Sequence, residues 1–166
     1  MEPARPEMSC TRLKITCWRC RLAEHMNGEA EDSIAKANAR FYRALESGSL
    51  EQMDEIWLHD DCTRCVHPGW EMISGWERVK KSWARIFESG QRMRVSPTEL
   101  QIWTLGEVAC VTCKENITIF DDASFDSAQA VATNVFVLSD GIWLMMVHHS
   151  SPVPVLVPDA ATDTIQ

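Results

Sequence analysis

Four segments with the pattern of β-strands follow one another without a helical pattern between them, and this run restricts the fold more than any other feature. The four segments lie near residues 92–104, 107–120, 127–139 and 142–151. Leu105-Gly106-Glu107 and Ser139-Asp140-Gly141 separate two of the pairs and have the composition of hairpin turns. Strands joined by tight turns pair antiparallel, so this part of the chain predicts an antiparallel meander.

Three helical patterns precede the meander. Apolar residues recur at helical spacing after Asp32-Ser33, a pair suited to cap a helix N-terminus, and Gly48 ends this pattern. Ser49 can cap a second, shorter helix, and a third helix is expected over 75–88, after a strand over 62–67. Helices kept apart from an antiparallel meander indicate an α+β domain in which the helices pack on one face of the sheet.

These patterns divide the chain into a poorly ordered basic extension over 1–31, a folded domain over 32–152 and a tail over 153–166. The whole chain has a net charge of −8, and this acidic balance argues against a nucleic acid partner, whose phosphates require lysine and arginine. No apolar run approaches the ~20 residues that span a bilayer, and the N-terminus lacks the apolar core of a secretory signal. We therefore expect a cytoplasmic protein with no membrane partner.

Seven cysteines include three pairs with the C-x-x-C spacing that can mark zinc: Cys17/Cys20, Cys62/Cys65 and Cys110/Cys113. The second and third pairs fall at or in predicted strands, where residues i and i+3 point to opposite faces of the sheet. Two thiols on opposite faces cannot hold one ion. Small buried hydrophobic groups in a reducing compartment are the favoured role, and no metal is expected.

The segment HPGWEMISGWERVKKSW, residues 67–83, concentrates three tryptophans and one histidine around a turn and the start of a helix. Such a concentration suggests a walled cavity. Trp57, Trp70, Trp83 and Trp103 would then line or roof a pocket for an apolar or ring-shaped small molecule. The alternative is that these rings fill the core between helices and sheet.

The last two strand segments, AVATNVFVL and IWLMMVH, are apolar on both alternating sets of positions. A sheet with one face in water would alternate, so both faces are expected to be covered. Because the helices cover only one face, a homodimer through the other face is the simplest arrangement.

In four segments the chain resembles the SnoaL-like branch of the nuclear-transport-factor-2-like superfamily: FYRALESGSLEQMDEIW, CVHPGWEMISGWERVKKSW, VTCKENITIF and ATNVFVLSDGIWLMMVHHSSP. The resemblance covers about residues 33–152. It implies a curved antiparallel sheet wrapped around three helices, forming a cone with a pocket at its open end, and dimerisation through the sheet. Some members of this superfamily are cyclases, isomerases, dehydratases or hydrolases, and others are association domains or have no known activity.

Within the superfamily, ketosteroid isomerase has an oxyanion tyrosine on its first helix and an aspartate base after its first strand. The resemblance puts Phe41 at the tyrosine position and His67 at the aspartate position, while Tyr42, one residue away, is expected to face elsewhere. This pattern argues against the isomerase reaction. It leaves open another acid-base reaction centred on histidine, with no cofactor required.

His67 is the favoured candidate for a general base, because imidazole titrates near neutrality and Pro68-Gly69 hold it at a strand end. The alternative is a structural histidine whose ring hydrogen-bonds a neighbouring strand and shapes the turn. Glu115 would be a buried acid that serves His67, or else an edge residue in contact with solvent. Adjacent His148 and His149 must face opposite sides of the last strand, and alternation with Trp143 and Met145 assigns His149 to the cavity.

Asn134, in the apolar segment AVATNVFVL, would bind the ligand or join strands as a structural amide. Two functions follow from these assignments. The first is a small-molecule pocket protein, with His67 as base and Glu115 or His149 as its partner. The second is a non-catalytic homodimerisation or ligand-sensing module whose pocket has no catalytic role.

Overall fold

The structure is a computed structural model that describes residues 28–120 and 125–154. Most of the expected N-terminal extension, with Cys17 and Cys20, and most of the expected tail therefore lie outside the described residues. Within the described part, no helix is both long enough and apolar enough to cross a membrane.

In the described residues, three helices and six strands form the α+β domain that the sequence predicts. The helices are α2 (Gly28–Ser47), α3 (Leu50–Asp54) and α4 (Trp76–Glu88). The strands are β1 (Arg64–Val66), β2 (Ile73–Ser74), β3 (Arg92–Leu105), β4 (Val108–Phe120), β5 (Phe125–Ser139) and β6 (Ile142–Pro152). They form one sheet in the order β2-β1-β6-β5-β4-β3, antiparallel throughout except where β1 runs parallel to β6.

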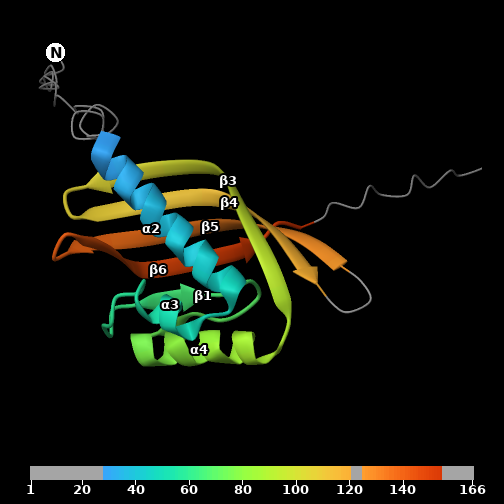
Figure 1. Ribbon diagram of the computed structural model, residues 1–166. Coiled ribbons are helices and arrows are strands. Elements are labelled where there is room, and N and C mark those ends of the chain that lie inside the picture. Colours follow the sequence, from blue (N-terminus) through green and yellow to red (C-terminus); the bar gives the residue numbers. More distant parts are fainter. Residues whose placement is uncertain (1–27, 121–124, 155–166) are drawn as a thin grey trace, which may run out of the picture.

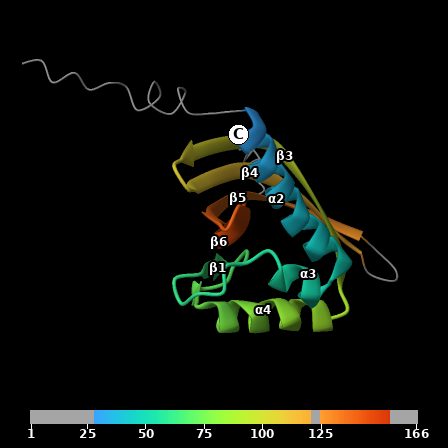
Figure 2. The same cartoon turned by 60° about the vertical axis from the view of Figure 1, so that its left-hand side comes forward.

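The sheet is curved, and all three helices lie on the same side of it. Figures 1 and 2 show α2 crossing this side, while α3 and α4 lie together at one end. A bulge after Thr98, where Glu99 has φ 55°, adds a residue to β3 opposite β4. Bulges bend and twist a strand, so this one helps β3 to curve toward the end where α4 lies. The predicted cone is confirmed.

Helix α2 buries one face because Ile34, Phe41 and Leu45 recur at helical spacing. It is already helical at Gly28, the first described residue, so Asp32 and Ser33 lie inside it and Ser33 Oγ donates to Ala30 O at 2.8 Å. The predicted N-cap was therefore wrong. Acidic residues in the first turn, among them Glu31, are favourable near the helix N-terminus and extend the helix backward.

The predicted ends of the short second helix and of α4 are close to those observed. Ser49 caps α3 by accepting from Gln52 N at 3.2 Å. Helix α4 follows Gly75, whose φ of 84° is strained for any residue with a side chain, and Gly75 N donates to Thr63 O at 2.8 Å. This contact fixes the start of α4 against the chain that leads into β1.

A second bulge, in β6, determines which side chains reach the interior. Val135 pairs with Val147 and the next residue, Phe136, pairs with Met145, so Met146 is an extra residue in β6. Alternation restarts after it. Met145 and His148 are therefore both buried, whereas His149 is exposed.

The other face of the sheet carries apolar side chains that are partly or largely exposed, including Trp103, Val131 and Val108. Cys110 is half-buried and Cys113 is buried, so the members of this pair lie on opposite faces as predicted. Among the described residues no group of three or more histidine, cysteine or acidic side chains is placed to hold a metal ion.

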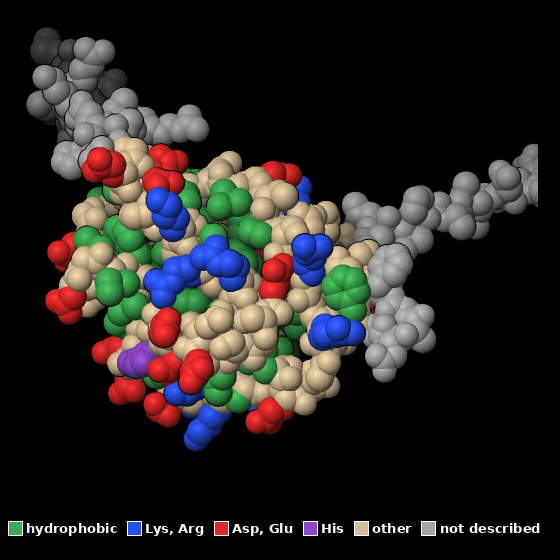
Figure 3. All heavy atoms as spheres, viewed as in Figure 1, with side chains coloured by type: hydrophobic (Ala, Val, Ile, Leu, Met, Phe, Trp, Pro, Cys, Tyr) green, Lys and Arg blue, Asp and Glu red, His purple; other side chains and the backbone are tan. Residues whose placement is uncertain are grey.

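The helical side of the molecule differs from the outer sheet face. In Figure 3 basic and acidic side chains intermingle over it. Two ion pairs illustrate this: Lys36 with Asp32 at 2.5 Å and Lys80 with Asp54 at 2.6 Å. Mixed charge of this kind is typical of a surface that faces solvent.

Candidate functional site

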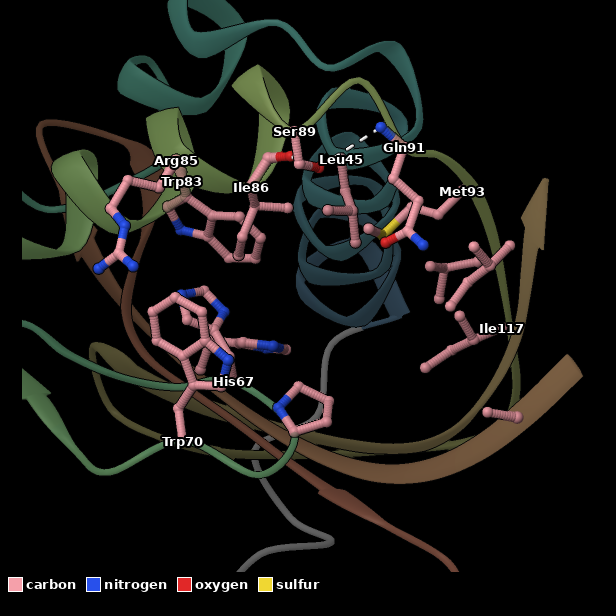
Figure 4. Close-up of a pocket in the computed structure, with 15 residues that line it drawn as sticks. Leu45, His67, Trp70, Trp83, Arg85, Ile86, Ser89, Gln91, Met93 and Ile117 are labelled. Carbon is pink, nitrogen blue, oxygen red and sulfur yellow. Dashed lines mark hydrogen bonds between the residues drawn. The ribbon is translucent and has the colours of Figure 1, made fainter. Parts of the chain in front are cut away.

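A cavity of about 460 Å³ opens between α4 and the concave side of the sheet (Figure 4). Most of its wall is apolar, with polar groups from only five side chains. The apolar residues are Leu45, Pro68, Trp70, Trp83, Ile86, Met93, Val95, Ile117, Ile119 and Ala128. The polar residues are His67, Arg85, Ser89, Gln91 and His148, and no carboxylate of the described residues lines the cavity.

His67 follows β1 and is 3% exposed. Its Nε2 lies 2.8 Å from Ser82 Oγ, and Ser82 donates its single hydroxyl proton to Val79 O at 2.7 Å. When the Ser82 hydroxyl donates to Val79 O, its oxygen accepts from Nε2–H of His67, and Nδ1 of the ring is then unprotonated. Burial lowers the pKa of His67 to about 4, and the ring is neutral at neutral pH.

Two tryptophans hold the His67 ring. Trp83 meets it edge-on with centroids 4.4 Å apart, and Trp70 does the same at 5.0 Å. The guanidinium of Arg85 lies 5.4 Å from the Trp70 ring on the same side of the cavity (Figure 4). The HPGW turn thus forms one wall of the cavity, with backbone support from Trp70 N to His67 O at 2.9 Å.

His148 reaches the same cavity from β6 and is also 3% exposed. Its ring packs against Phe41 with centroids 4.8 Å apart, and its Nδ1 lies 2.7 Å from Asn134 Oδ1. Burial, with smaller contributions from His67 and His149, lowers the pKa of His148 to about 3. Two neutral imidazoles therefore share the wall of one apolar cavity.

Behind His148 lies a set of buried polar side chains. Glu115 accepts from Tyr42 Oη at 2.8 Å and from Ser150 Oγ at 2.5 Å. Asn134 Nδ2 lies 3.3 Å from Tyr42 Oη and 2.8 Å from Asn38 Oδ1. Burial raises the pKa of Glu115, although both of its hydrogen bonds oppose this effect, and burial also raises the pKa of Tyr42 far above its ordinary value.

The structure does not bring the three predicted catalytic residues together. His67 lines the cavity, Glu115 is buried outside the cavity wall, and His149 is exposed with its Nε2 3.0 Å from Ser151 Oγ. The assignment of His149 to the cavity side was wrong, because the extra Met146 in β6 reverses the alternation. His148 occupies the place expected for His149.

Only some of the residues predicted to line the pocket do so. Trp70 and Trp83 line the cavity, whereas Phe41 and Trp57 lie in the core and Asn134 joins strands and helix as a structural amide. Trp103 is on the outer sheet face, because it pairs with Cys110 while its neighbour Ile102 faces inward.

Tyr42 was missed by the sequence argument, which expected it to face elsewhere. Both Phe41 and Tyr42 are buried, since α2 is covered by the sheet on one side and by the other helices on another. The sequence signal that could have found it is the i, i+4 spacing of two polar groups, Asn38 and Tyr42, beside the apolar stripe.

A cone-shaped α+β domain, whose described residues form an apolar cavity lined by two buried histidines, is thus the class of protein that the fold and site define. The SnoaL-like domain model matches residues 34–155. The chain belongs to this family, within the NTF2-like superfamily.

Two solved structures share both fold and sequence with the chain. One is a proposed dehydratase of the NTF2-like family from Streptomyces avermitilis, 31% identical, with a TM-score of 0.72 over 78% of this chain and 100% of that one. The other is a proposed calcium/calmodulin-dependent protein kinase type II association domain from Thiobacillus denitrificans. It is 28% identical, with a TM-score of 0.61 over 71% and 93%.

A curated relative is the F-box protein SKIP8 of Arabidopsis thaliana, 31% identical over 121 residues. The match covers 72% of this chain and 49% of that protein, so the chain spans about half the length of this relative.

Proposed function

We propose that the domain binds a small, mostly apolar molecule in the cavity, and that His67 and His148 exchange protons or hydrogen bonds with it. The observation that carries this proposal is the pair of buried, neutral histidines in an otherwise apolar wall. The cavity volume falls within the range of about 300–1,000 Å³ usual for small-molecule sites.

The chemistry that suits this wall is cofactor-independent proton transfer. A neutral imidazole can accept a proton from a carbon next to a carbonyl, or from a hydroxyl, and can return it at another atom. The apolar wall keeps water away from the reacting atoms. The likeness to the proposed dehydratase from S. avermitilis supports this reading, because loss of water from an alcohol requires both steps.

The bicyclic ketone 2-tetralone is a suitable probe, because exchange of its α-hydrogens in D₂O reports a general base directly. We expect the protein to accelerate the exchange, and the His67→Gln and His148→Gln variants to lose roughly 100-fold or more of that acceleration. Ile117→Trp, which adds bulk to the cavity wall, should abolish it. Proton NMR of the ketone measures the rate.

The matched control is His149→Gln, which changes an exposed histidine beside His148 and should exchange at the wild-type rate. Val131→Trp controls for Ile117→Trp on the outer sheet face. Equal rates for wild type and Ile117→Trp would remove the cavity from the reaction, and equal rates for all histidine variants would remove the proposed bases.

A second candidate function is an association module. The exposed apolar residues of the outer sheet face support it, as do the likenesses to a proposed kinase association domain and to part of an F-box protein. In this reading two copies pair through the sheet.

The unpaired thiols of the described cysteines support the expected location in the reducing cytoplasm.

The pairing proposal predicts a dimer in solution. Light scattering of the wild type at micromolar concentration should give twice the mass of one chain. Val135→Arg, in the middle of the outer face, should give a monomer, because the face would then bury an unpaired charge. Lys36→Ala on the exposed side of α2 is the control and should remain dimeric. A wild-type monomer would contradict the pairing.

A further inference from the structure

Glu115 is a buried carboxylate to which the proposed acid-base chemistry gives no part. It nevertheless ends a chain of hydrogen-bonded side chains that reaches the cavity. The chain runs from Glu115 on β4 to Tyr42 on α2, then to Asn134 on β5 and to His148 on β6. Its three contacts measure 2.8, 3.3 and 2.7 Å.

The direction of each hydrogen bond follows from the number of protons available. Burial raises the pKa of Glu115, but the hydroxyls of Tyr42 and Ser150 both favour its ionised form, and an ionised carboxylate has no proton, so in that form Tyr42 must donate to Glu115. The phenol has only one proton, so its oxygen can only accept from the Cys113 thiol, 3.2 Å away, and from Asn134, and the amide nitrogen must face Tyr42. The amide oxygen then faces His148, whose Nδ1 must carry the proton.

The amide of Asn38 indicates that Glu115 sets the direction of these hydrogen bonds. Its Nδ2 is a buried donor that has no partner among the described residues, while its Oδ1 accepts from Asn134. If both amides were turned over, Asn38 Nδ2 would donate to Asn134 Oδ1 and be satisfied. A buried amide N–H without a partner is costly, so Asn38 by itself favours the opposite direction.

The carboxylate outweighs this preference. Hydrogen bonds to an ionised group are about twice as strong as those between neutral groups, and leaving a buried charge short of donors costs more than leaving one amide N–H. Glu115 requires the proton of Tyr42, and this fixes the orientation of the Asn134 amide. Asn38 Nδ2 is therefore left without a partner among the described residues.

We propose that Glu115 is a positioning residue: through Tyr42 and Asn134 it holds the proton of His148 on Nδ1 and leaves Nε2 unprotonated toward the cavity. Nε2 makes no hydrogen bond with any described residue, and the ring lines the cavity. With Ser82 accepting from its Nε2, His67 likewise leaves Nδ1 unprotonated, and among the described residues the thiol of Cys65 lies 3.8 Å from that nitrogen.

This inference adds a requirement to the proposed function. Both cavity histidines offer hydrogen-bond acceptors, so the ligand must bring donors. Arg85, Ser89 and Gln91 bring donors to other parts of the same wall, and the indole N–H of Trp83 is buried, so the requirement applies where the ligand meets the two histidines. An apolar ring molecule with a hydroxyl or enol group meets the requirement, and one whose oxygen is capped does not.

The test is the tautomer of His148, read from nitrogen-15 shifts in long-range proton–nitrogen correlation spectra of the labelled protein at pH 8. Loss of signals in His148→Gln assigns them. We expect Nδ1 to be the protonated nitrogen in the wild type. In Tyr42→Phe nothing opposes the preference of Asn38, so the proton should move to Nε2, and Glu115→Leu should have the same effect. Ser150→Ala removes the other donor to Glu115 and should keep Nδ1–H.

A merely structural role for Glu115 would lower stability without moving the proton. A wild type protonated on Nε2 overturns the inference, as does retention of Nδ1–H in folded Tyr42→Phe or Glu115→Leu. The wild-type spectrum shows which nitrogen of His148 carries the proton even if both variants fail to fold. In a separate arm, 2-naphthol should bind at least about 10-fold more tightly than 2-methoxynaphthalene. If neither binds, the proposed function fails while the tautomer result stands.

Discussion

Lowering the pH from 7 to 5 is expected to reduce the free energy of unfolding by about 4 kcal/mol. His67 and His148 have folded pKa values of about 4 and about 3, below the value of 6.5 for the free side chain. Between these limits the unfolded chain binds more protons than the folded one, so stability falls as the pH falls below 6.5. Each histidine contributes about 2 kcal/mol of the loss by pH 5.

Urea unfolding at a series of pH values measures this loss. His148→Gln should flatten the curve by about half, whereas the exposed His149→Gln should leave its slope unchanged. Glu115 acts in the opposite sense. Burial raises its folded pKa, so its contribution favours the folded state at low pH and diminishes as the pH rises through that value. Stability that stays constant from pH 7 to 5 would contradict the burial of both rings.

Replacing Phe41 by alanine is expected to destabilise the domain by about 4 kcal/mol. The ring is fully buried, and its centroid lies 4.8 to 6.2 Å from those of Tyr42, Trp57, Trp83 and His148. Its removal leaves a cavity between helices and sheet that neighbouring rings fill only in part.

Thermal or urea unfolding gives the measurement. Phe41→Leu retains most of the volume and should cost far less, and Trp103→Ala on the outer face serves as the control for loss of an exposed ring. Small losses for Phe41→Ala, comparable to those for Trp103→Ala, would show that Phe41 lines open space, as the sequence argument assumed.

The strands of the meander could be predicted to within two residues, because turn residues such as Asp140-Gly141 punctuate alternating or apolar runs. The start of α4 could be predicted for a similar reason: Gly75 is the residue that its strained backbone requires. These signals come from the turn and cap residues themselves, so the nearby sequence is enough to predict the ends of these elements.

The site was harder, because its geometry depends on partners far away in the chain. The bulge at Met146 arises from the pairing of β5 with β6, and an apolar stretch such as WLMMV gives no sign of it. The burial of Tyr42 depends on α2 being covered from two sides. The sequence therefore found His67 and identified Glu115 as unusual, yet it chose the wrong histidine on β6.

The bulge at Met146 also matters for how such domains diverge. One residue gained or lost in a central strand ordinarily turns every later side chain to the other face, so insertions and deletions are confined to loops. Here the bulge accommodates the extra residue, and the alternation that places His148 inside resumes directly after it. A relative with one residue fewer in this strand can keep the same cavity, and an alignment that puts its gap beyond the bulge would equate the wrong residue with His148.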